Sequence, residues 1–358
     1  MDLLLDPAGA PAGRRPLRHG FLDARSPRVM VVSGPPSPGL EVALRRMSDD
    51  LNAAGRIAEQ HRLTVLPRAT ETVHPEGPVH ALGTATAGVR VGLEAGLEGG
   101  GPLGLRRRWA LAHTLAPVMA AAFANAPLRH GRPTGWRSIR QALRRDLPVL
   151  PGQPAKDRLA NDRLPNDRLP NDRLANDRLA NDRLAKDRLA KDPRDMWVAY
   201  VMDTPEQSGR SLRQRIRAGG RPTVADLERH MAGLRPPVAA RGHLELDVAD
   251  RQPGDGWRLP AAVTAVLMDD PRAAEDAWQV TAPLAGEAGL WERAARGALT
   301  DPVLAAAARD CFLIAYAALA RLGVSRELRD ATAEHIERYV SRGRCPADDV
   351  LDQVTARG

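Results

Sequence analysis

The fold of this chain is decided by the stretch Arg241-Gly242-His243-Leu244-Glu245-Leu246-Asp247-Val248-Ala249-Asp250. Apolar and polar residues alternate within it: Leu244, Leu246 and Val248 alternate with His243, Glu245 and Asp247. A period of two predicts a strand whose apolar face is buried and whose other face carries an imidazole and two carboxylates. A solvated cleft could use those groups, but the pattern alone also fits an ordinary sheet edge. The turn at 252–257 ends the strand, and a helix is expected from about Pro260.

Composition sets the broad class. The 358 residues suffice for one large domain or two ordinary ones, and 43% hydrophobic with 3% aromatic residues predicts an aliphatic core. The net charge is +8, but the arginines are scattered through expected helices without interleaved aromatic residues, which disfavours nucleic-acid binding. Two cysteines indicate neither a disulfide framework nor a metal site. Because no segment reaches roughly 18 consecutive apolar residues, we expect a cytoplasmic protein with no membrane partner. The sequence does not predict the oligomeric state.

Elements alternate before residue 256 and become uniformly helical after it. Apolar spacing predicts helices over 40–61, 105–125, 260–268, 272–282, 287–297, 302–322 and 326–342. Thr223 and Asp226 form a capping-box pattern before another helix. Short strands are expected at 3–5, 29–32, 63–66 and 89–93. The chain is therefore expected to be α+β, with a helical C-terminal part.

A low-complexity segment separates the two halves of the chain. Asp-Arg-Leu recurs seven times at a spacing of five, from Asp157 to Leu189. A step of five residues spirals the leucines around a helix, so they build no apolar stripe. We interpret 155–191 as a disordered, solvated linker between 1–154 and 192–358, the two parts of one domain. A ligand-binding repeat is the alternative.

Four segments carry a resemblance to a known family: 120–128 with 131–141, 192–197, 235–257 and 337–349. In them the chain resembles the glutamate-cysteine ligase of ergothioneine biosynthesis in actinomycetes, a branch of the plant-type glutamate-cysteine ligases. The resemblance implies an open-faced antiparallel sheet that carries the active site and is packed with helices.

The resemblance also implies a reaction. ATP would phosphorylate the γ-carboxylate of glutamate, and the cysteine amine would attack the acyl phosphate to give γ-glutamylcysteine. Such chemistry needs carboxylates for Mg²⁺ and arginines for the phosphoryl group. On this basis Glu245, Asp2 and Glu41 are the expected metal ligands, and Arg137 and Arg140 the expected catalytic arginines. Substrate or ATP contacts are expected from Arg90, Glu94 and His243.

Departures from the family pattern fall on the same residues. The family's Leu-Glu-Leu-Arg ends in Asp247 here, and its Val-Gln-Val-Asn-Leu-Asp strand has become 89–94, without either amide. A Glu-Pro-Gly-Gly-Gln-Val-Glu-Leu segment is compared with 37–44, where both glutamates are lost. The family's opening strand is reduced to a tail in which Asp2 stands where the second glutamate would be. Either the reading frame starts upstream of Met1, or the chain is a decayed paralogue; the interior substitutions favour decay.

Three hypotheses follow. The chain is an ATP-dependent glutamate-cysteine ligase, or it is a non-enzymatic relative that retains the fold and binds an amino acid or a partner protein. The third, polyanion binding through the arginines, is the weakest, and salt-dependent DNA binding would support it.

Overall fold

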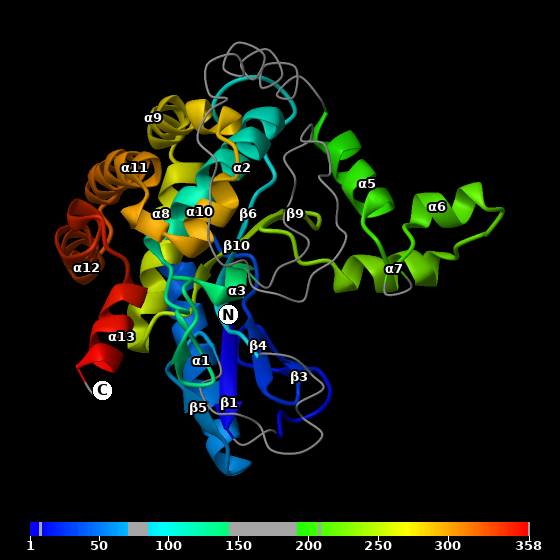
Figure 1. Ribbon diagram of the computed structural model, residues 1–358, viewed down its shortest axis with the longest axis horizontal. Coiled ribbons are helices and arrows are strands. Elements are labelled where there is room, and N and C mark those ends of the chain that lie inside the picture. Colours follow the sequence, from blue (N-terminus) through cyan, green and yellow to red (C-terminus); the bar gives the residue numbers. More distant parts are fainter. Residues whose placement is uncertain (7–8, 71–84, 143–191, 207–208, 357–358) are drawn as a thin grey trace.

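The structure is a computed structural model that describes residues 1–6, 9–70, 85–142, 192–206 and 209–356. Antiparallel sheets and many helices confirm the expected α+β class (Figure 1). The predicted linker at 155–191 lies outside the described residues, so the division of the chain at that segment stays a prediction.

The larger sheet has five strands in the order β2-β3-β4-β1-β5. All its pairs are antiparallel, and Asp2 on β1 stands opposite Val31 on β4. Helix α1 contacts β4 and β5. The bounds are β1 (Asp2–Asp6), β2 (Arg15–Pro16), β3 (Phe21–Ser26), β4 (Val29–Ser33), α1 (Leu40–Gln60) and β5 (Thr64–Leu66).

The stretch quoted first forms the central strand of a second, three-stranded sheet. Its order is β6 (Gly88–Leu93), β10 (Leu244–Asp250) and β9 (Val238–Ala240). The register places Glu245 between Gly92 and Ala239. A bulge between Leu246 and Ala249 sets residues 247 and 248 opposite Arg90 alone.

The bulge corrects one expectation. Asp247 was expected on a solvated polar face, but its side chain is buried. His243 is exposed and Glu245 half-buried, so the alternation with solvent holds only for the first half of the strand. Beyond Leu246 both faces are covered.

Helix α2 (Leu105–Ala122) forms the centre of the core. Alanines dominate its second half, and nearly all its side chains are buried because β10 and the helices α9, α10 and α11 surround it. The C-terminal helices are α8 (Arg258–Asp269), α9 (Pro271–Thr281), α10 (Leu290–Arg296), α11 (Pro302–Arg321), α12 (Arg326–Arg338) and α13 (Pro346–Thr355). A 3-10 helix at Gly254–Trp257 leads from β10 into α8, and others follow α9, α10 and α12 at Ala282–Gly286, Ala298–Thr300 and Val340–Arg342.

Helix α11 bears on the expectation about apolar segments. Among the described residues it is the one helix whose length and composition would allow it to cross a membrane. Half of its most apolar window is buried inside the fold, where it packs on α2, α8, α9 and α12. A core helix passes the same test of length and composition.

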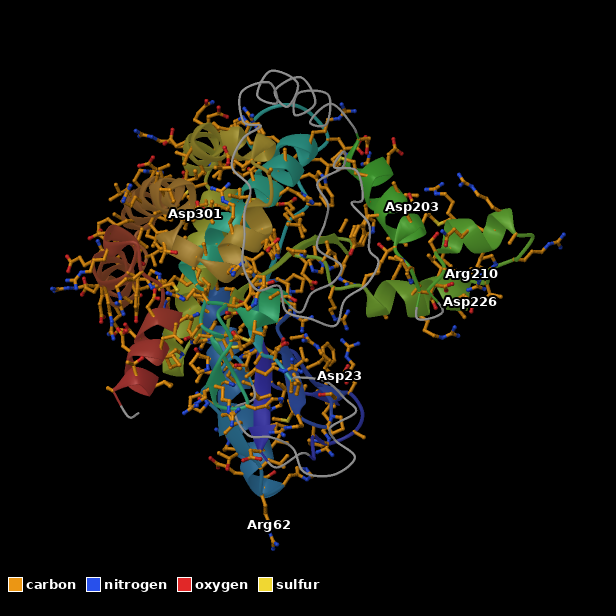
Figure 2. The ribbon with its side chains drawn as sticks, in the orientation of Figure 1. Asp23, Arg62, Asp203, Arg210, Asp226 and Asp301 are labelled. Carbon is orange, nitrogen blue, oxygen red and sulfur yellow. The ribbon has the colours of Figure 1, made fainter. Side chains whose placement is uncertain are left out.

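Three helices form an arm that stands away from the helical body in Figure 1. They are α5 (Pro193–Asp203), α6 (Leu212–Arg217) and α7 (Val224–Gly233). The predicted capping box at Thr223 and Asp226 is present at the start of α7. Figure 2 shows Asp203 and Asp226 on this arm, each of which pairs with arginines of the arm itself. The arm leads the chain from α7 back to β9. The remaining elements are α3 (Ile139–Ala142) and the hairpin of β7 (Leu128–Arg129) and β8 (Arg132–Pro133).

Candidate functional site

A fully buried carboxylate lies where the two sheets approach each other. Asp2, at the start of β1, is 0% exposed. Its Oδ1 accepts hydrogen bonds of 2.9 Å from Nη2 of Arg25 on β3 and of 2.9 Å from Nη2 of Arg90 on β6. Nη1 of Arg25 lies 2.9 Å from Oδ2. Two half-buried guanidinium groups therefore hold this one carboxylate.

A second charged layer lies beneath the first. Arg140 on α3 is almost fully buried; its Nη2 donates to Asp247, and its Nη1 lies 3.5 Å from Oδ1 of Asp250. Burial works to lower the pKa of Arg140, but Asp247 and Asp250 outweigh it and the pKa is raised. A side chain at Gly88 would overlap the guanidinium of Arg140, so β6 needs glycine there.

Four guanidinium groups lie close to one another at this sheet, where Arg235 and Arg241 both donate to the carbonyl of Leu234. Arg235, between α7 and β9, donates from Nη1 to the carbonyl of Leu234 at 2.8 Å and forms no ion pair with any described residue. Its pKa is lowered, first by burial and then by the charges of Arg25, Arg90 and Arg241. Arg241 pairs with Glu245, since its Nε lies 3.3 Å from Oε1 of Glu245. We refer to Arg25, Arg90, Arg235 and Arg241 as the arginine cluster.

A sixth arginine, Arg251, is buried without hydrogen-bond partners for two of its nitrogens. Arg251 is 8% exposed, and its Nε and Nη1 have no hydrogen-bond partner. Burial lowers its pKa to about 10, and the charge of Asp2 offsets this only in part. Burying a guanidinium without a full set of acceptors costs desolvation free energy, which lowers the stability of the folded state.

The structure brings together five of the eight residues expected to form the site. Arg90 contacts Asp2, and Asp2, Asp247 and Glu245 together raise the pKa of Arg90 against the effect of its burial. Arg140 lies one layer below through Asp247. The exposed ring of His243 passes next to Gly92 on β6.

The other three residues lie in different surroundings. Glu41, in the first turn of α1, accepts a hydrogen bond of 2.9 Å from the backbone nitrogen of Ser325. Arg137 donates from Nε to Asp348 Oδ1 at 2.6 Å. Glu94 is exposed directly after β6.

The donor set does not fit a magnesium ion in the described part of the chain. Mg²⁺ is held by carboxylates that converge with free oxygens. Here Asp2 is engaged by two arginines, Glu245 by Arg241, and Glu41 by a backbone amide at the start of α12. No group of three or more His, Cys, Asp or Glu side chains that could hold a metal ion occurs among the described residues.

Sequence reasoning missed four members of the site, Arg25, Arg235, Arg241 and Arg251. Arg25 is on a strand that was not expected, and its separation of 23 positions from Asp2 hides their contact. A weak signal existed for Arg235 and Arg251, since each lies close to an end of the β9–β10 hairpin, which was the predicted site. Arginines next to a strand that carries carboxylates are candidates for the same face.

Comparisons with known proteins identify the family of this chain. The model of "Glutamate-cysteine ligase family 2" matches residues 73–152 and 176–358. The glutamate-cysteine ligase EgtA of Mycolicibacterium smegmatis is 36% identical over 279 residues, which is 78% of this chain and 59% of that protein. The EgtA proteins of two Mycobacterium tuberculosis strains, CDC 1551 and H37Rv, are 31% identical over 349 residues, 91% of this chain and 75% of theirs. The chain thus spans 59% of the length of the first of these relatives.

Proposed function

This chain belongs to glutamate-cysteine ligase family 2, and on that premise we propose that it joins glutamate to cysteine at the expense of ATP. The observation that carries the proposal is the arginine cluster, which lies around Glu245 and Asp2 at the sheet formed by β6, β10 and β9. Glutamate, cysteine and ATP all carry anionic groups, and guanidinium forks suit carboxylate and phosphate oxygens.

The route is the acyl-phosphate mechanism. An oxygen of the glutamate γ-carboxylate attacks the terminal phosphorus of ATP, and ADP leaves. The cysteine amine then attacks the acyl carbon, phosphate leaves, and the amine loses a proton. Both steps move negative charge onto phosphate oxygens, which positioned cations stabilise. Arg90, Glu94 and His243 are proposed to contact the substrates or ATP.

Arg137 and Arg140 receive a narrower role. Their guanidinium groups are engaged by Asp348 and Asp247, so we assign them to positioning. Arg140 holds the bulged part of β10 from below, which keeps residues 247 and 248 opposite Arg90. The product would serve ergothioneine synthesis in the cytoplasm.

A second candidate function is favoured by one specific observation. Asp2 is neutralised by Arg25 and Arg90, and no metal-ligand group of three is present in the described residues. A relative that binds an anionic ligand without turnover would tolerate this arrangement, whereas carboxylates that must hold magnesium would not.

The test uses the purified full chain with ATP, magnesium and glutamate, with and without cysteine. ADP release and γ-glutamylcysteine are measured together, and heavy oxygen in the glutamate γ-carboxylate reports the mechanism. The ligase proposal expects cysteine-dependent dipeptide, with one labelled oxygen transferred to phosphate for each dipeptide. A folded protein that makes neither product overturns it in favour of the binding function. Dipeptide without label in phosphate overturns the acyl-phosphate route alone.

A further inference from the structure

We propose that the arginine cluster binds a small phosphate dianion directly, with guanidinium groups in the place of a divalent cation. The site shares its sheet face with the proposed ligase function, but binding at it does not require turnover. The proposal starts from the misfit between the carboxylates of this chain and a metal ion.

The charge count of the cluster is the first argument. Arg25 and Arg90 pair with Asp2, Arg241 pairs with Glu245, and Arg235 adds a fourth positive charge, so this layer carries two more positive than negative charges. A phosphate monoester group at neutral pH carries a charge of about −1.5 to −2. A phosphate group therefore neutralises the layer, whereas a single carboxylate leaves part of the surplus.

Asp2 supplies the second argument. Two guanidinium groups on one fully buried carboxylate carry the same formal charge as a divalent cation on that carboxylate. Arg25 and Arg90 keep 24% and 19% of their side-chain surface exposed, so part of each side chain still reaches solvent. The ion pair fixes the direction of both forks before a ligand arrives, which reduces the ordering cost of binding.

Arg235 supplies the third argument. Its known hydrogen bonds are made by Nη1 to backbone carbonyls of Ala232 and Leu234, and no described carboxylate pairs with it. It is half-buried among three like charges. Like-charged groups held close together with water partly excluded are stabilised by an anion that contacts several of them at once. The carboxylates of the layer below do not supply such an anion, because Asp247 and Asp250 already pair with Arg140.

The experiment titrates inorganic phosphate into the full chain by calorimetry, in EDTA and again in magnesium. We expect binding in EDTA that magnesium changes by less than about 2-fold and that added salt weakens. Acetate, the carboxylate probe, is expected to bind at least about 10-fold more weakly. Phosphate binding that appears only with magnesium, or acetate binding equal to phosphate, overturns the proposal.

Two variants locate the site. Arg235→Gln is expected to weaken phosphate binding about 10-fold, because it removes a cation that has no structural ion pair. Arg229→Gln, on the exposed face of α7, is the matched control and should change nothing. Glu245→Gln is expected to strengthen binding, since it removes a negative charge from the same layer. Equal affinities in Arg235→Gln and wild type, or weaker binding in Glu245→Gln, would contradict the assignment.

The outcomes separate this inference from the ligase proposal. Phosphate binding in EDTA without dipeptide formation leaves the site standing and removes the ligase function. Dipeptide formation without metal-free phosphate binding does the reverse.

Discussion

The carboxylate of Asp2 lies 2.9 Å from Nη2 of Arg90, a residue 88 positions further along the chain. This contact joins the first strand of the larger sheet to an edge strand of the smaller one. Asp2 is fully buried, and its other guanidinium partner, Arg25, comes from a third strand. A single carboxylate thus connects both sheets at the candidate site.

Removing that charge should destabilise the protein. Asp2→Asn leaves two guanidinium groups facing each other with no anion between them, and the free energy of unfolding should fall by about 2–4 kcal/mol. Partial solvation of both arginines keeps the loss at the lower end of that range. Urea denaturation measures it. The control is Asp23→Asn on β3, an exposed residue labelled in Figure 2, which should stay within about 0.5 kcal/mol of wild type. Equal effects of the two changes would contradict the role of Asp2.

Gly88→Ala tests the buried layer below. The new methyl group overlaps the guanidinium of Arg140, which is fixed by Asp247 and the carbonyl of Ala249 and cannot swing into solvent. We expect a loss of about 1–3 kcal/mol in thermal or urea unfolding. Gly55→Ala in α1 meets no atom within 4 Å and should instead add about 0.5–1 kcal/mol of stability. A neutral Gly88→Ala would show that Arg140 is not held as described.

We predict that the buried charge of Arg251 lowers the stability of the fold. At pH 7 its buried guanidinium is charged, and two of its nitrogens have no acceptor. Arg251→Met keeps much of the side-chain volume and removes the unpaired group, so the free energy of unfolding should rise by about 1–3 kcal/mol. Arg309→Met, on the exposed side of α11, is the matched control and should have little effect. A large loss of stability in Arg251→Met would mean that this charge has a partner that stabilises the fold.

His335 should make stability depend on pH in the acid range. Its ring stacks on Phe312 and contacts Phe123, and burial lowers its pKa to about 4. Because the folded pKa lies below the ordinary 6.5, the unfolded chain binds the proton first as pH falls. Stability should therefore decrease between about pH 6.5 and pH 4, by at most about 1.4 kcal/mol per pH unit for this group.

The variant that checks this is His335→Phe, which keeps an aromatic ring in the stack and removes the titrating group. The acid slope of unfolding free energy should become shallower but persist in part, because His113 is shifted in the same way by burial. An unchanged slope would show that His335 does not contribute to the pH dependence.

Much of the fold could be predicted from local pattern. The helix expected over 40–61 is α1, Leu40–Gln60, and the one expected over 302–322 is α11, Pro302–Arg321. The strand at 244–250 follows from its period of two. These elements are specified by residues close in sequence, through apolar spacing and caps.

The site could be predicted only in part, because its contacts are non-local. The pattern placed Asp247 on a solvated face, yet a bulge and Arg140 from α3 bury it, and neither is visible in a run of alternating residues. Strand β3, which carries Arg25, has too little apolar alternation to be recognised. The roles expected of Glu41 and Arg137 came from resemblance, and the structure places both in contacts away from Asp2.

In the proposed site, guanidinium groups take the place of a metal ion at Asp2. Titrating magnesium alone into the metal-free protein, without nucleotide, tests this assignment most directly. Because Arg25 and Arg90 already engage Asp2, we predict no binding tighter than about 1 mM, the weak end of protein sites for such ions. Magnesium that binds more tightly than this, and no longer does so in Asp2→Asn, would contradict the assignment and restore Asp2 as a metal ligand.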